Sequence, residues 1–210
     1  MKPGRVTVRG AAAVPGRPDR VEMSLSLTVL EQSPAAALEE VARRAERLTS
    51  VLDALHIGTD QWSTSGATVS QELQWDGQRQ VHRGYRSAYR VTVRLSDGNL
   101  VGRLMHDAVE QAEAEVAGPW WRIGPGNPAR LDACREAAAN ARRKAEAYVE
   151  GLGVRLGAVL GASEPTVSAG DGAVFRMAAA GGAATENLDI QPGEQEVAAT
   201  IDVTFRLEAP

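Results

Sequence analysis

The chain has 210 residues and a formal net charge of −4, from 23 Lys and Arg against 27 Asp and Glu. That length allows a sizeable core, in one large domain or two small ones. The acidic balance argues against a generic nucleic-acid binder, which normally carries a basic excess or a basic face, so we expect no nucleic-acid partner. Aromatic residues make up only 4% of the chain, so Ala, Val and Leu must supply most of the packing.

The N-terminal segment contains no apolar run long enough for a signal peptide. No other segment approaches the roughly 20 apolar residues of a membrane span. We therefore expect a soluble cytoplasmic protein, exported if a leader was trimmed from the sequence. Cys134 is the single cysteine, which excludes an intrachain disulfide. Its place among apolar residues indicates a small buried hydrophobe rather than a reactive thiol.

The first third of the chain predicts two strands and a helix. Residues 5–10 alternate as a short strand, residues 11–18 have the Pro and Gly of a turn, and residues 20–30 alternate cleanly as a half-buried strand. Ser33-Pro34 then begins a helix that ends near Gly58. Its apolar stripe favours packing on a sheet over a coiled coil and consists of Leu38, Val41, Ala45, Leu48, Leu52 and Leu55.

Residues 62–75 and 85–96 alternate like the two strands of one hairpin, and Asp76-Gly77 between them is a strong turn signal. The wet face of the second strand carries basic residues, including Arg86, Arg90 and Arg94. We interpret them as solvated surface charges. A basic ligand platform is the alternative.

Residues 99–114, with Asp97 as the expected cap, predict a second helix. The strand predicted over residues 115–123 is interrupted by Gly118-Pro119, which indicates a sheet edge or a bulge.

Trp120 and Trp121 must face opposite ways if that strand is regular, so we expect one ring in the core and the other exposed. An exposed tryptophan is a candidate interface anchor, and burial under a loop is the alternative.

A long helix is predicted over residues 128–151, with Asn127 as N-cap before a first-turn proline. Alternating steps of three and four give it an apolar stripe of Leu131, Cys134, Ala138, Ala141, Ala145, Tyr148 and Leu152. Because the stripe is mostly alanine, we predict a tight contact at Ala138, Ala141 and Ala145.

Two strands, over residues 154–163 and 194–208, end the chain, and the Gly- and Ala-rich residues 164–192 between them predict a flexible loop. Strands and helices are interleaved, yet the strands are amphipathic. This favours an α+β fold in one domain, residues 1–210, with an antiparallel or mixed sheet and long amphipathic helices packed on one face. The two halves loosely repeat a strand–helix–strand–strand order, which hints at pseudo-symmetry.

Several segments resemble the SIMPL domain family, also called DUF541. They are Pro18-Asp19 before one strand, Gly84-Tyr85-Arg86 before another, the Ala-Arg-Arg-Lys-Ala-Glu-Ala core of residues 138–153, and the run 190–197 before the last strand. The resemblance implies an α+β fold and self-assembly, because the family includes a ring-like bacterial antigen. It also implies links to oxidative-stress defence in the periplasm and, through an animal member, to a kinase partner. It implies no agreed chemistry.

The residues themselves contain no catalytic pattern. His56, His82 and His106 are dispersed, and none has a second ligand at a metal-like spacing. There is no phosphate loop and no Gly-x-Ser-x-Gly motif. We therefore expect no catalytic residues, no metal and no cofactor.

The sequence thus favours a non-enzymatic self-assembling or binding protein, a homo-oligomer with Trp120 or Trp121 at an interface. The alternative is a small-molecule-binding protein or enzyme with a pocket between sheet and helices, under residues 164–192. A third interpretation is a scaffold for another protein, by analogy with the kinase-binding relative.

Overall fold

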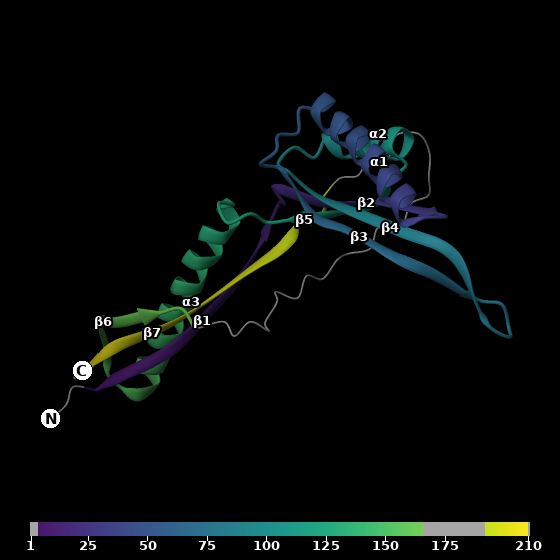
Figure 1. The fold of residues 1–210 in the computed structure, drawn as a ribbon. Helices are drawn as coiled ribbons and strands as arrows, with labels where there is room; N and C mark the ends of the chain where they lie inside the picture. Colours follow the sequence, from purple (N-terminus) through teal and green to yellow (C-terminus); the bar gives the residue numbers. More distant parts are fainter. Residues whose placement is uncertain (1–3, 166–191, 210) are drawn as a thin grey trace. The chain divides into compact units, whose positions relative to one another are not determined.

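The computed structural model describes residues 4–165 and 192–209. Within them the chain divides into two compact units (Figure 1). Unit 1 consists of residues 4–18, 123–165 and 192–209, and unit 2 of residues 19–122. We predict one domain with one sheet from the sequence, whereas the structure has a separate sheet in each unit. The expected loop over residues 164–192 lies almost entirely outside the described residues.

Unit 2 is a four-stranded antiparallel sheet with helices on one face (Figure 1). Its strand order is β3-β4-β2-β5. Leu25, Leu27, Val91 and Val93 of the central strands β2 and β4 are buried, and they pack in one core with residues of both helices. The elements of unit 2 are β2 (Arg20–Glu31), α1 (Pro34–Ala54), β3 (Trp62–Trp75), β4 (Gln80–Leu95), α2 (Leu100–Ala112) and β5 (Glu115–Arg122).

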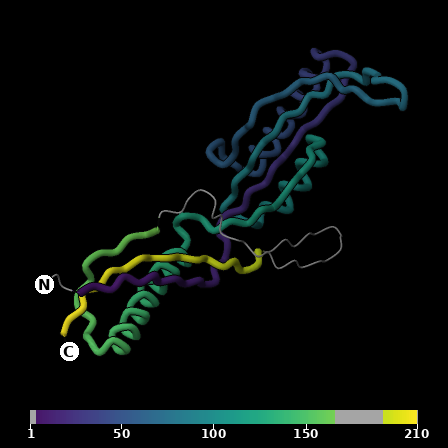
Figure 2. Tube along the Cα trace, turned by 90° about the horizontal axis from the view of Figure 1, so that it is seen from below, coloured from purple at the N-terminus to yellow at the C-terminus, as the bar shows by residue number. Residues whose placement is uncertain are grey.

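Unit 1 is a three-stranded antiparallel sheet of order β1-β7-β6, with one long helix alongside β1 and β7. Figure 2 shows β1 and β7 running side by side. The elements of unit 1 are β1 (Arg5–Gly16), α3 (Pro128–Leu152), β6 (Arg155–Ser163) and β7 (Gln195–Glu208). The turn predicted over residues 11–18 is wrong for most of its length, because β7 provides a pairing partner as far as Gly16, which lies opposite Gln195.

The two units repeat one topology. In unit 2, β2-α1-β3-β4 forms a sheet of order β3-β4-β2; in unit 1, β1-α3-β6-β7 forms a sheet of order β6-β7-β1. Both repeat helices also begin alike. The side chains of Ser33 and Asn127 each accept a hydrogen bond from a backbone N–H of the first turn, and a proline follows each cap. Unit 2 is inserted in sequence between β1 and α3, and it adds α2 and β5 to the repeat.

The expected α+β class and the three helices are confirmed, with local corrections. Asp97 does not cap α2. It instead accepts a hydrogen bond from the backbone N–H of Asn99, the N-cap residue, whose own side chain makes no capping bond. On α1, most of the predicted stripe packs into the core, but Leu38 in the first turn is exposed.

The predicted stripe of α3 is wrong except at Ala141 and Ala145. Leu131, Cys134, Ala138, Tyr148 and Leu152 are exposed. The buried residues follow a strict spacing of four: Ala129, Ala133, Ala137, Ala141, Ala145 and Val149. Such a row is a ridge inclined to the helix axis by about 26°, so it follows a twisted sheet better than a straight stripe does.

The alanine ridge lets α3 approach β1 very closely at Gly10. A Cβ at this position would lie 2.0 Å from the carbonyl oxygen of Ala137 and 2.8 Å from the Cβ of Ala141. Real atoms do not approach that closely, so only glycine fits here. The contact therefore fixes helix and strand at a separation that side chains larger than alanine do not allow.

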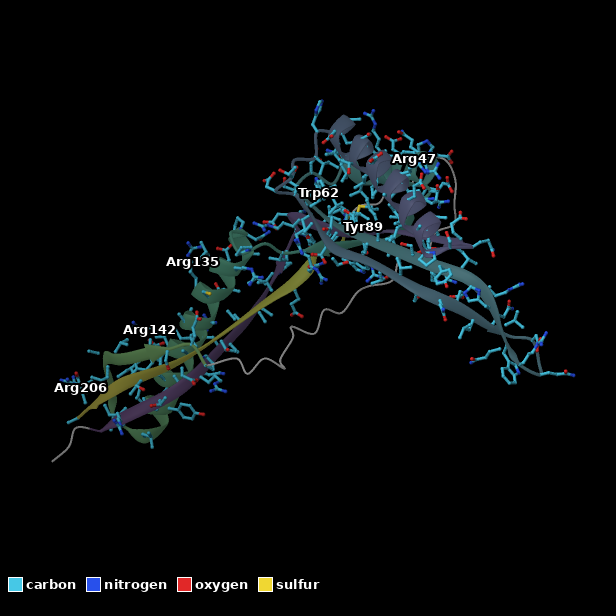
Figure 3. The ribbon with its side chains drawn as sticks, viewed as in Figure 1. Arg47, Trp62, Tyr89, Arg135, Arg142 and Arg206 are labelled. Atoms are coloured by element: carbon cyan, nitrogen blue, oxygen red, sulfur yellow. The ribbon has the colours of Figure 1, made fainter. Side chains whose placement is uncertain are left out.

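The helices of unit 2 are joined by a cluster of charges. Arg44 of α1 donates from Nε to Glu40 at 2.8 Å, and its Nη2 forms an ion pair at 2.8 Å with Glu113, beyond the end of α2. Arg43 also contacts Glu40, and Arg47 lies 3.4 Å from Glu113 (Figure 3). The hydrogen bond from Arg44 is the main reason that the pKa of Glu40 lies below 4.5.

We predict that Ala141→Leu destabilises the protein by roughly 1–3 kcal/mol, because the added atoms have no space against Gly10. Thermal unfolding should show a fall of about 2–4 °C in Tm per kcal/mol. The matched control is Ala138→Leu on the exposed side of the same helix, with an expected change of about 0.5 kcal/mol or less. Equal losses of stability in both variants would contradict the burial of Ala141 in the alanine ridge.

A second prediction concerns pH. Because the folded-state pKa of Glu40 is lowered, the cluster stabilises the fold above pH 4.5 and loses this contribution as the pH falls through the folded pKa. Glu40→Gln should therefore lower Tm at neutral pH, and the difference from the wild type should shrink below about pH 4.5. Glu39→Gln, at an exposed neighbour, is the control. A difference that stays constant down to pH 3 would exclude this linkage.

Candidate interaction surfaces

The described residues do not gather a metal-binding cluster. Among them, no group of three or more His, Cys, Asp or Glu side chains is placed to hold a metal ion. His56 follows α1 in a left-handed conformation, His82 packs edge-on against Tyr85 at 5.0 Å, and His106 lies on α2. Cys134 is exposed, not buried as predicted, because the buried ridge of α3 lies on another side of the helix.

The two adjacent tryptophans face opposite ways, as predicted. The strand that carries them, β5, is an edge strand with a cis Gly118-Pro119 bond and a shift in its pairing with β2. Trp121 is partly buried against the core of unit 2, and its ring leaves space only for hydrogen at Gly98, where a Cβ would lie 2.6 Å from it. Trp120 lies opposite Glu22 on the other face and is 40% exposed. Trp120 is thus the ring available to a partner.

The arginines of β4 lie on the face of the sheet away from the helices, where their own chain pairs them. Arg86 donates two hydrogen bonds to Glu72, at 2.8 and 2.9 Å. Arg94 donates to Glu22 at 3.0 Å. The hydrogen bond from Arg86 is the main cause of a lowered pKa of Glu72. This arrangement favours solvated, paired charges over a basic ligand platform.

The hairpin of β3 and β4 ends in the Asp-Gly turn that the sequence predicted. The carboxylate of Asp76 accepts hydrogen bonds from the backbone N–H groups of Gln78 and Arg79, at 3.0 and 2.9 Å, which closes the turn. Near it, Leu73 is 49% and Trp75 63% exposed. None of the β3 residues is buried, although the strand alternates apolar and polar residues over much of its length. The outer part of the hairpin therefore presents apolar side chains to solvent.

A shallow depression of about 270 Å³ lies in unit 1 where β1 ends and β7 begins. Its lining combines backbone and short side chains with two carboxylates: Ala13, Val14, Pro15, Glu194, Gln195 and Glu196. It has few side chains that could orient a ligand, so its geometry does not define a binding site.

No helix among the described residues is long and apolar enough to span a membrane. The fold defines a class: an α+β protein with two antiparallel sheets. One sheet has two helices on one face and the other has one, and both units are built on the same topology. Within that class the chain belongs to the SIMPL family, whose model, described as a protein of unknown function (DUF541), matches residues 6–205.

Other comparisons add little. A search of curated proteins gives no match. Among solved structures, the chain is similar to one described as "a putative amidohydrolase/peptidase from Burkholderia cenocepacia", with 19% identity and a TM-score of 0.24. The match covers 62% of this chain and 33% of that one, so this chain spans about a third of the other protein's length. A likeness at this level carries no argument about fold or activity.

The opposite orientations of the two tryptophans lead to a prediction. Trp121→Ala removes a ring that packs on the core and should cost roughly 2–3 kcal/mol, because the ring is partly buried. Trp120→Ala should change the stability of the monomer by about 0.5 kcal/mol or less. Thermal unfolding at low protein concentration measures both. The reverse order would show that the orientations are wrong.

Proposed function

We propose that this SIMPL protein is a non-enzymatic, self-assembling protein whose working form is a homo-oligomer. The observation that carries the proposal is the set of large apolar side chains that are exposed in both units. In unit 2 the set includes Leu73, Trp75 and Trp120; in unit 1 it includes Leu131, Tyr148, Leu152, Val159 and Leu160. Single exposed apolar residues are ordinary, but a pair on one face of a strand, such as Leu73 with Trp75, is typical of interaction surfaces.

Family resemblance supports the same proposal, because a similar bacterial protein forms a ring. Closed symmetry is the usual outcome for soluble homo-oligomers. A role in defence against oxidative stress, which the resemblance also implies, is part of the proposal. Comparing the oxidant sensitivity of cells with and without the gene tests that role.

The test of assembly is sedimentation of the purified full chain at micromolar concentration. We expect a species heavier than the 22.3 kDa monomer. Trp120→Ala should shift the distribution toward the monomer, because aromatic rings at interfaces commonly contribute more than 1 kcal/mol to binding. Arg135→Ala, an exposed change on α3 (Figure 3), is the control. A wild-type protein that sediments only as the monomer would refute the proposal.

A further inference from the structure

A sheet edge exposes unpaired backbone groups, and three of the four sheet edges among the described residues are protected. On β1, side chains of α3 occupy outward backbone groups: Asn140 accepts a hydrogen bond from the N–H of Ala11 at 3.2 Å, and Lys144 donates to the carbonyl of Arg9 at 2.9 Å. On β5, the cis proline and the pairing shift interrupt the edge. On β6, the pairing with β7 is irregular at two places, and no regular run exceeds three residues.

The fourth edge, β3, also has two register shifts in its pairing with β4, but between them it keeps a longer regular run than β6 does. From Ala67 to Glu72 each residue has one partner on β4, in unbroken register from Tyr89 to Gly84. This run contains no proline, no glycine and no lysine. Its opposite side is an edge of the sheet among the described residues. This run consists of five uncharged residues followed by Glu72, all in regular pairing with β4, so it is well suited to pair with another strand.

The charges on this run permit pairing with a second copy of the same strand. Glu72 is its single ionisable residue, and that carboxylate is already held by Arg86 of its own chain. When two copies of β3 pair antiparallel about a twofold axis within residues 67–71, the two Glu72 residues lie at opposite ends of the pairing. No like charges then face each other, so no electrostatic term opposes self-pairing.

The exposed apolar residues of the hairpin lie where such a pairing covers them. Val69, Leu73 and Trp75 share one face of β3, because they are separated by even numbers of residues. Val69 lies opposite Ser87, which is fully buried on the helix side of the sheet. These residues of β3 therefore lie on the helix side too, in the part of the sheet that α1 does not reach. Antiparallel pairing of two β3 strands brings the end of one hairpin beside the start of the partner's strand. Leu73 and Trp75 then lie beside the first half of the second copy's β3, where the small residues of that strand cover part of their exposed surface.

We infer that residues 67–72 of β3 pair antiparallel with the same residues of a second copy, forming a continuous eight-stranded sheet across a twofold axis. This inference rests on the proposed self-assembly and names the surface and the partner for its first step. The contact is isologous, so it closes as a dimer and leaves other surfaces, such as that of Trp120, free for larger assemblies.

The first experiment introduces a charge at the edge. Thr68 is exposed, lies opposite Ala88 and is on the face of the arginines, so Thr68→Glu is compatible with the fold of its own chain. Across the twofold axis it places two carboxylates near each other. We expect the dimer dissociation constant to rise about ten-fold at low salt and to recover partly at high salt. The matched control, Ala162→Glu on the irregular edge β6, should leave the constant unchanged.

The second experiment maps the axis. In a Cys134→Ser background, single cysteines are placed at positions 67 to 71 and oxidised. A disulfide needs Cα atoms within about 7 Å, so only the one or two positions next to the twofold axis should give a covalent dimer. A cysteine in place of Ala162 should give none. Circular dichroism of each variant confirms that the fold is retained.

The outcomes separate this inference from the proposed function. An oligomer whose dissociation constant is unchanged by Thr68→Glu, with no disulfide at any of the five positions, would overturn β3 pairing and leave self-assembly intact. A wild-type protein that is always monomeric would overturn both. Monomeric protein that instead binds a different chain along β3 would overturn the twofold contact in favour of a separate partner.

Discussion

The width of an α-helix limits how much of a sheet it can cover, and much of this structure follows from that limit. A helix with its side chains is about 10 Å across, and neighbouring strands are about 4.8 Å apart, so one helix covers roughly two strands. Each repeat has three strands and a single helix of its own. In unit 1 α3 packs on β1 and β7, and in unit 2 α1 packs on β2 and β4. The equivalent outer strands, β6 and β3, have no buried residues.

The two repeats pack their helix on the sheet with different side chains. Unit 2 fills the space between helix and sheet with Leu and Val, whereas unit 1 brings a ridge of alanines against a strand that has glycine at the closest point. A close helix buries less apolar area per residue but makes dense contacts. Its larger apolar residues, such as Leu131 and Tyr148, find no space beneath the helix and lie exposed. The use of alanine instead of leucine on the buried side of α3 thus explains both the tight contact and the exposed apolar residues.

Much of this fold can be predicted from the sequence, and the parts that cannot share a physical cause. Period-two alternation identified β2, β4 and β7, and caps such as Ser33 and Asn127 placed the helix starts within a residue. The alanine stripe of α3 was misplaced because a run rich in alanine gives no contrast between faces, so spacing alone decides, and a straight stripe is the wrong geometry on a twisted sheet. The strand over residues 11–16 was missed because Ala, Pro and Gly have low strand propensity. A long partner, β7, outweighs that preference.

The candidate surfaces were predictable only in part for a similar reason. That Trp120 and Trp121 face opposite ways follows from strand geometry, but which ring is exposed depends on which face carries α2 and on the space at Gly98. The edge position of β3 has no signal in the local sequence, because a strand that pairs with one neighbouring strand and a strand that pairs with two can have the same alternation of apolar and polar residues. Edge position is a property of topology. It becomes visible only when the protection of β1 by Asn140 and Lys144 can be compared with the unprotected run of β3.

The repeated topology also bears on how an assembly of this chain can close. Two equivalent outer strands, both open, would allow β3 of one copy to pair with β6 of the next, and such a head-to-tail contact produces a ring if the rotation closes and an open chain or fibre if it does not. The repeats differ where this matters. Both strands lose their register twice, but β6 keeps no regular run longer than three residues, whereas β3 keeps one of six residues. Irregularity on one of two equivalent edges disfavours the heterologous pairing, and the pairing of identical edges that we infer does not depend on β6. Divergence between the repeats therefore favours a closed dimer over a filament.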